Sequence, residues 1–171
     1  MRVRDHIVLS TAAAGIGWRW LGPSVAGLWA GGVLIDADHY LWFCLHERGV
    51  SPRAAVRFFN AAHAPQHAAT RALHRPTALI ALLLASARLP RLLPLAAGML
   101  LHASLDAFHD GRMDRARAAA LHRDRFACQT CGSRGPHVGT HIRHQPWLLP
   151  SYRTQNLISL CGPCHAAAHA G

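Results

Sequence analysis

The segments 128-CQTC-131 and 156-NLISLCGPCH-165 decide the fold of the last third of this 171-residue chain. They place four of its five cysteines in two CxxC pairs, Cys128 with Cys131 and Cys161 with Cys164. A two-residue gap lets both sulfurs of a short turn face one ion, and tetrahedral Zn²⁺ takes four such ligands. Buried free cysteines or two disulfides would explain the two identical spacings poorly, so the pattern predicts a structural zinc site.

Two histidines follow the second cysteine pair. His165 and His169 are four residues apart, so on a helix that begins near Cys164 they share one face and can reach a single cation.

The run from Phe126 to His169, about a quarter of the chain, resembles the zinc-stapled form of the HNH endonuclease family, most specifically in NLISLCGPCH. The resemblance implies a treble-clef-like ββα-metal unit that holds one divalent cation over a scissile phosphate. It implies that His141 is the general base and that Asn156 orients it. It also implies that His165 and His169 are ligands of the catalytic cation, which would be Mg²⁺, Mn²⁺, Ni²⁺ or Zn²⁺.

The role of His141 has a chemical basis. A neutral imidazole with an ordinary pKa near 6.5 can take a proton from water at neutral pH, provided that an acceptor fixes its tautomer. This chain departs from the family at Thr140, where a His, Asp or Glu ligand usually precedes the base. His144 or His137 would then have to supply that ligand, or the cation would bind weakly. The alternative is a zinc module that binds nucleic acid or protein without cutting.

The charge of the chain agrees with an anionic partner. The formal net charge is +10, every basic residue is arginine, and residues 111–171 hold eight arginines against Asp114 and Asp124. The planar guanidinium binds two phosphate oxygens at once, which favours nucleic acid, with DNA as the expected partner. A solvated face or a membrane-surface anchor is the alternative. The expected nucleic-acid-binding residues are Arg112, Arg115, Arg117, Arg123, Arg125 and Arg143.

The first 110 residues are rich in Ala, Leu and Gly, and their pattern predicts helices throughout. Four apolar segments can be drawn, at residues 7–18, 21–35, 77–87 and 92–107. Only the second, uncharged from Trp20 to Ile35, approaches the roughly twenty residues that a bilayer span needs. The alternatives are a compact membrane-embedded bundle and a soluble bundle with an apolar surface, and we favour the first.

Ionisable residues recur at the ends of these segments. If the four helices run up and down, one level of the bundle collects residues from all four of them. Because an ionisable group beside an apolar helix is costly, their convergence predicts a shared metal or proton site, with helix-capping as the alternative. The residues are His6, Asp36, Asp38, His39, His74, His102 and Asp106.

This arrangement resembles a family of membrane-bound metal-dependent hydrolases over residues 5–109. The shared pattern is an N-terminal His, a DxDH after the second helix, a His before the third and HxxxD in the fourth. Here 74-HRP-76 lacks the second histidine that many members carry shortly downstream. The resemblance implies a second hydrolytic centre and leaves its substrate open.

The distribution of arginine predicts an orientation. Most arginines fall on the side of the His/Asp cluster, and only Arg19, Arg88 and Arg91 fall on the other side. By the positive-inside tendency, we expect the inner (cytoplasmic) membrane, with the zinc domain facing the cytoplasm and membrane lipid as a partner. No cleavable signal peptide and no organic cofactor is expected.

The expected protein is mainly α-helical. Residues 1–110 would form a four-helix, membrane-associated, metal-dependent hydrolase-like domain, residues 111–125 a basic linker helix, and residues 126–171 a four-cysteine zinc domain of the HNH type. The expected function is metal-dependent hydrolysis of nucleic-acid phosphodiester bonds. The alternatives are a membrane-tethered zinc module that binds without catalysis, and a hydrolase whose active centre is the N-terminal His/Asp cluster.

Overall fold

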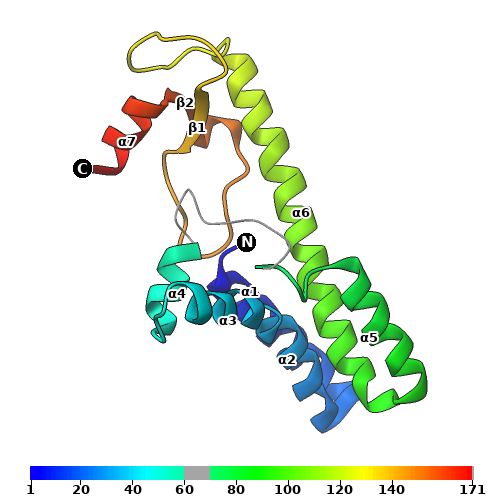
Figure 1. The fold of residues 1–171 in the computed structure, drawn as a ribbon. Coiled ribbons are helices and arrows are strands. Elements are labelled where there is room, and N and C mark those ends of the chain that lie inside the picture. Colours follow the sequence, from blue (N-terminus) through cyan, green and yellow to red (C-terminus); the bar gives the residue numbers. More distant parts are fainter. Residues whose placement is uncertain (60–69, 171) are drawn as a thin grey trace. The chain divides into compact units, whose positions relative to one another are not determined.

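The computed structural model describes residues 1–59 and 70–170, and these are mainly helical with one small sheet, as the sequence predicts. The chain divides into two compact units, Met1–Asp106 and Ala107–Gly171. Helix α6 (Leu93–Arg123) passes from the first unit into the second, so the expected linker helix is the second half of this longer helix (Figure 1). No proline follows Pro94 in α6, so nothing in the sequence breaks the helix between the two predicted segments.

Glycine or proline interrupts the chain after two helices of the first unit, α1 and α5. The chain leaves α1 through Gly22, whose positive φ of 50° favours glycine, and passes Pro90 before entering α6. The bounds are α1 Val3–Leu21, η1 Gly22–Ser24, α2 Val25–Leu34, α3 Ala37–His46, α4 Pro52–Phe59, α5 Pro76–Arg88 and η2 Pro90–Leu92. The expected long apolar segment at 21–35 is therefore divided, and its α-helix has only ten residues.

Helices α2 and α6 meet backbone to backbone. A Cβ added at Gly31 would lie 2.1 Å from the carbonyl oxygen of Leu95, and one added at Gly98 would lie 2.1 Å from that of Leu28. No side chain fits at either glycine, and the two helices approach as closely as small residues allow. Because the two helices approach this closely, the backbone carbonyl oxygen of Gly32 in α2 accepts a hydrogen bond from His102 in α6.

The first unit buries polar side chains and exposes apolar ones. Its buried residues include Asp5, Ser10 and Thr70 besides the predicted His/Asp cluster. Large apolar side chains are exposed along its helices, as in Trp20 at 73% and Leu84 at 67%. Buried ionisable side chains and exposed large apolar ones are both uncommon in a protein surrounded by water, and the unit also buries apolar residues such as Ile35, Phe43 and Met99.

One helix in the described ranges 1–59 and 70–170 is long and apolar enough to cross a membrane. It comprises Pro90–Arg123, and its most apolar window has a mean hydropathy of 1.2. The same length and composition also occur in core helices of soluble proteins, so this helix alone does not establish a membrane span.

The second unit packs a two-stranded sheet between two helices. Strand β1 (Val138–Ile142) pairs antiparallel with β2 (Leu157–Cys161), with His141 opposite Ile158. The 3-10 turn η3 (Thr154–Asn156) precedes β2, and α7 (Gly162–Ala170) follows it. On one face, Leu157 and Ile142 pack against Ala116 and Ala120 of α6. On the other, Ile158 and Leu160 pack against the cysteines.

An ion pair fixes the end of α6 to β2. The Asp124 carboxylate pairs with Arg123 at 2.7 Å and accepts the backbone N–H of Ser159 at 3.2 Å. Arg123 also donates to the carbonyl oxygens of Thr154 at 2.8 Å and Leu157 at 2.9 Å. These bonds connect the helix to the strand that carries the second cysteine pair.

Candidate functional site

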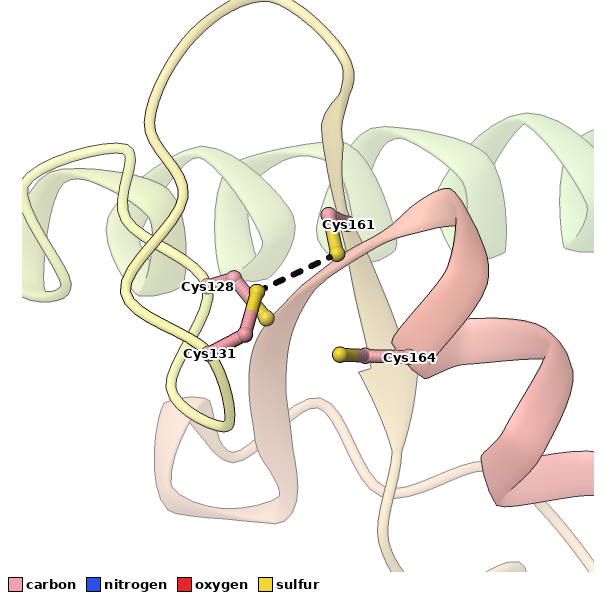
Figure 2. Close-up of side chains that lie close together, drawn as sticks. All are labelled: Cys128, Cys131, Cys161 and Cys164. Atoms are coloured by element: carbon pink, nitrogen blue, oxygen red, sulfur yellow. Dashed lines mark hydrogen bonds between the residues drawn. The ribbon is translucent and has the colours of Figure 1, made fainter.

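The four cysteines of the two CxxC pairs come together around one point (Figure 2). Cys128 and Cys131 lie on the turn after α6, while Cys161 ends β2 and Cys164 lies in the first turn of α7. Their sulfur atoms lie within 4.8 Å of one another, and those of Cys131 and Cys161 are 3.5 Å apart. A tetrahedral Zn²⁺ with bonds of about 2.3 Å would separate its sulfurs by about 3.8 Å, so the thiols fit this ion.

The protonation of these thiols is also informative. Backbone N–H groups of Cys131 and Cys161 lower the pKa of the Cys128 thiol to about 6. The neighbouring sulfurs of Cys161 and Cys128 raise the pKa of Cys164 to about 12. Four thiolates this close repel one another, and a bound cation removes that repulsion. The donor set therefore fits a metal centre better than four free thiols.

Three histidines form a second cluster in this unit. The ring nitrogens of His141 on β1 and of His165 and His169 on α7 lie within 4.8 Å of one another. The ring centroids are 4.8 to 5.1 Å apart, and the rings stand nearly edge to face. Burial, followed by the charges of His165 and His169, lowers the pKa of His141, which keeps that imidazole neutral. Neutral imidazoles are suitable ligands for Zn²⁺ and Ni²⁺.

Thr140 lies apart from this cluster. Side chains alternate along a strand, so Thr140 shares its face with Ile142, which packs towards α6, while His141 lies on the face of Ile158. The suggested substitute ligands do not join the three histidines either. His137 bonds to the Ser133 hydroxyl at 2.8 Å, and His144 is exposed after the end of β1.

Asn156 contacts the backbone near the cluster. Its amide donates to the carbonyl oxygen of His144 at 2.7 Å and accepts the N–H of His144 at 2.9 Å. Both atoms of the amide therefore bind the loop that follows His141, and neither is bonded to the His141 ring. The geometry is that of a positioning residue, which ties the chain after β1 to the chain before β2.

The predicted nucleic-acid-binding arginines have different environments. Arg123 forms an ion pair with Asp124 and donates hydrogen bonds to two backbone carbonyl oxygens. Arg117 pairs with Asp114 at 3.5 Å. Arg112 and Arg115 line a polar pocket with Tyr152 and Thr154. Arg125 and Arg143 are both exposed, Arg125 on the turn after α6 and Arg143 just after β1.

The seven predicted residues of the first unit also come together. Their ligand atoms form three overlapping groups, each within 4.8 Å. The groups are His6 with His102 and Asp106, Asp36 with His74 and His102, and Asp38 with His39 and His74. Because His102 and His74 are shared, the groups are one continuous cluster assembled from α1, α3, α6 and the turns before α3 and α5.

Hydrogen bonds orient the two shared histidines. His102 Nδ1 donates to the carbonyl oxygen of Gly32 at 2.9 Å, so its Nε2 carries the free lone pair when the ring is neutral. That Nε2 lies 3.3 Å from His74 Nε2, 3.6 Å from Asp36 and 3.4 Å from Asp106. His74 Nδ1 faces Asp38 at 3.3 Å. A carbonyl or carboxylate behind each ring is the usual support of a metal-bound histidine.

The remaining ligands surround this pair. His6 stacks on His102 with centroids 3.6 Å apart, and its Nε2 lies 3.0 Å from Asp106. Its buried Nδ1 has no hydrogen-bond partner among the described residues. His39 bonds to the backbone oxygen of Thr70. Asp106 also pairs with the amino group of Met1 at 2.7 Å.

A protonated His74 offsets part of the carboxylate charge in this cluster. Burial lowers the pKa of His74, but bonds to Asp36 and Asp38 outweigh it and raise the pKa to about 9. Burial raises the pKa of Asp36, yet the bond to His74 and the nearby histidines bring it below its usual value. A positive charge is thus favoured between the two carboxylates, and a divalent cation is chemically suited to the same place.

Several groups that contact the site residues could not be identified from the sequence. The carbonyl oxygens of Gly32 and Thr70 act through the backbone, which any residue type supplies. Tyr152 adjoins arginine only because the loop before β2 returns to α6. Comparison with protein-family models, with curated proteins and with solved structures finds no match.

Proposed function

We propose that the second unit is an HNH-type, metal-dependent endonuclease that hydrolyses phosphodiester bonds of nucleic acid. One observation carries the proposal: His141, from a strand, meets His165 and His169, from a helix, beside four convergent cysteines. The order of strand, strand and helix around this cluster is that of a ββα-metal unit, and we assign the unit a treble-clef-like fold.

Each residue of the proposed centre has one task. His165 and His169 would hold a divalent cation, which when bound polarises a phosphoryl oxygen and stabilises the leaving oxygen. His141 takes a proton from the attacking water, for which it must be neutral. Asn156 holds the loop after His141, and Arg112 and Arg115 of α6 bind the anionic backbone. The zinc of the four cysteines holds the strand and helix together.

The test is plasmid cleavage by the purified full-length protein with Mg²⁺, Mn²⁺, Ni²⁺ or Zn²⁺. His141→Ala should abolish nicking and retain zinc in the four-cysteine site. The matched control is His137→Ala, because His137 is also a histidine of this unit but lies outside the cluster. Equal loss in both variants, or nicking that survives His141→Ala, would refute the proposal.

Metal binding separates the two possible roles of His141. As a general base, its removal should leave the cation affinity of the cluster nearly unchanged while cleavage stops. As a third ligand, its removal should weaken the affinity, because second-sphere and ligand changes cost about 10-fold or more. The affinity of the native and His141→Ala proteins for Mn²⁺, measured by a titration monitored with electron paramagnetic resonance, distinguishes these outcomes. If native protein binds nucleic acid and never cuts it, the unit is a non-catalytic zinc module.

We also propose that the first unit is a four-helix bundle associated with the inner membrane, made by α1, α2, α5 and the first half of α6. The support is that the large apolar side chains of Trp20 and Leu84 are exposed while the ionisable His6 and His102 are buried. The arginine distribution then favours a cytoplasmic zinc unit. Carbonate extraction and protease protection of the tagged protein would test both statements.

A second candidate function is hydrolysis at the His/Asp cluster of the first unit. The specific observation is an apolar pocket of about 350 Å³ that reaches Asp36 and His39 and is otherwise lined by side chains such as Val33, Val56 and Phe59. A substrate with an apolar chain would lie in this pocket with its polar group at the cluster. Metal analysis of His102→Ala against Cys44→Ala tests it, because only the first should lose bound cation.

A further inference from the structure

A polar pocket opens on the second unit, between α6 and the segment that leads into β2. It has a volume of about 440 Å³ and is lined by Arg112, Arg115 and Ala116 from α6, and by Tyr152 and Thr154. Two guanidinium groups, a hydroxyl and a phenol ring contribute to its wall, and no carboxylate of the described residues does. The pocket is therefore suited to an anion.

Contacts around the pocket order Arg112. Its guanidinium carbon lies 5.0 Å from the ring centroid of Tyr152 and 5.4 Å from that of Phe108. The Tyr152 hydroxyl is in turn bonded to His109 Nδ1 at 3.0 Å, which fixes the ring. A guanidinium held on an aromatic face loses less freedom when it binds a ligand.

Arg115 leaves most of its donors available. Its Nε donates to the carbonyl oxygen of Gly111 at 2.9 Å, and the described residues show no other hydrogen bond of this side chain. Within residues 1–59 and 70–170, neither Arg112 nor Arg115 forms an ion pair, and the nearby Asp114 pairs with Arg117. Two unneutralised guanidinium groups at one pocket favour binding of a phosphate over a neutral ligand.

We propose that this pocket binds a backbone phosphate of a nucleic-acid strand at a position other than the scissile phosphate. The inference deepens the proposed nuclease function and rests on it for the identity of the ligand. A nucleic acid is favoured over a free anion because the same unit carries the three-histidine cluster, and because residues 111–171 carry eight arginines against two aspartates. The pocket anchors the strand while the histidine cluster acts on another phosphate.

The test measures the affinity of full-length, zinc-loaded protein for a fluorescent DNA duplex without added catalytic cation. Arg115→Gln and Arg112→Gln should each weaken binding about tenfold and reduce the salt dependence by about one phosphate contact. Tyr152→Leu should weaken binding less, by releasing Arg112. The matched control is Arg117→Gln, which lies on the same helix but is already paired with Asp114. Unchanged circular dichroism and zinc content show that each variant is folded.

Several results would overturn the proposal. One is DNA binding with native affinity by both Arg112→Gln and Arg115→Gln. Another is an equal loss of affinity in Arg117→Gln, because the loss would then reflect only the reduced net charge of the protein. Inorganic phosphate and a mononucleotide serve as competitors. If either binds at the pocket while duplex affinity is unaffected by the pocket variants, the source is a free anion and the nucleic-acid proposal fails.

A His165→Ala protein separates this proposal from the nuclease proposal. If it binds DNA with native affinity and that affinity still falls with Arg115→Gln, the pocket is supported even where cleavage is never observed. If the native protein cleaves DNA and the pocket variants cleave and bind like it, the pocket proposal fails and the nuclease proposal stands.

Discussion

Replacing Asp124 with asparagine should destabilise the second unit through loss of a single charge. The Asp124 side chain is 7% exposed, pairs with Arg123 at 2.7 Å and accepts the N–H of Ser159. The Arg123 bond and the Ser159 bonds outweigh burial and lower its pKa from 3.8 to about 2. A lowered pKa means that the stabilisation is complete above about pH 4 and is lost as the pH falls towards 2.

The shift corresponds to about 2 kcal/mol at pH 7, and this is an upper value because asparagine keeps part of the hydrogen bonding. Hydrogen exchange of the β2 amides in the full-length protein should therefore accelerate by about 5-fold to 30-fold in Asp124→Asn. Substitution is a cleaner test than acidification, since acid also protonates the cysteine thiolates of the metal-binding cluster.

The matched control for this prediction is Asp114→Asn. Asp114 lies on the same helix and pairs with Arg117 at 3.5 Å, but its side chain is 73% exposed. Exposed pairs contribute little, so its exchange rates should change by less than about twofold. Unchanged β2 exchange in Asp124→Asn, or an equal change in both variants, would refute the reasoning.

Three further substitutions test other parts of the structure. Gly31→Ala should lower the stability of the first unit in thermal unfolding by about 1–3 kcal/mol, because its Cβ meets a backbone carbonyl, whereas Gly15→Ala has open space and should not. Cys164→Ser should remove one zinc equivalent, measured by metal analysis, and should unfold the second unit, measured by circular dichroism. Cys44→Ser should do neither. Thr140→His should not raise plasmid cleavage, since this side chain lies on the strand face opposite His141; a gain would contradict the strand assignment.

The cysteine pairs were predictable because their information is local. Spacing within 128-CQTC-131 and 161-CGPC-164 determines which sulfurs can converge, whatever surrounds them. The partnership of His165 with His169 follows from helical spacing in the same way. The meeting of His141 with both depends on the pairing of β1 with β2, which the family resemblance supplied and spacing alone did not.

The cluster of the first unit was predictable for a different reason. Alternating helix directions bring the end of α2 and the start of α5 to one level, so His74 and Asp36 could be placed together before any contact was known. The details could not be predicted. That Gly31 and Gly98 allow backbone contact, and that Gly32 orients His102, depends on the packing distance between helices. Sequence periodicity does not report that distance.

The pocket beside Tyr152 could not be predicted from the sequence. Arginine on α6 indicated an anionic partner, but the ring that holds Arg112 comes from a later loop of the chain, which no periodic pattern connects to the helix. Arg123, which the sequence predicts to bind nucleic acid, donates to a backbone carbonyl of β2. Counting charges predicts a class of partner and does not assign roles to individual arginines.

The most direct test of the central claim is the rate at which full-length protein nicks supercoiled plasmid as the Mn²⁺ concentration is raised. We predict a rate that saturates with Mn²⁺ in the native protein and vanishes in His165→Ala, while the zinc of the four cysteines is retained in both. Nicking by His165→Ala at the native rate, or absence of nicking by the native protein at every Mn²⁺ concentration, would contradict the claim.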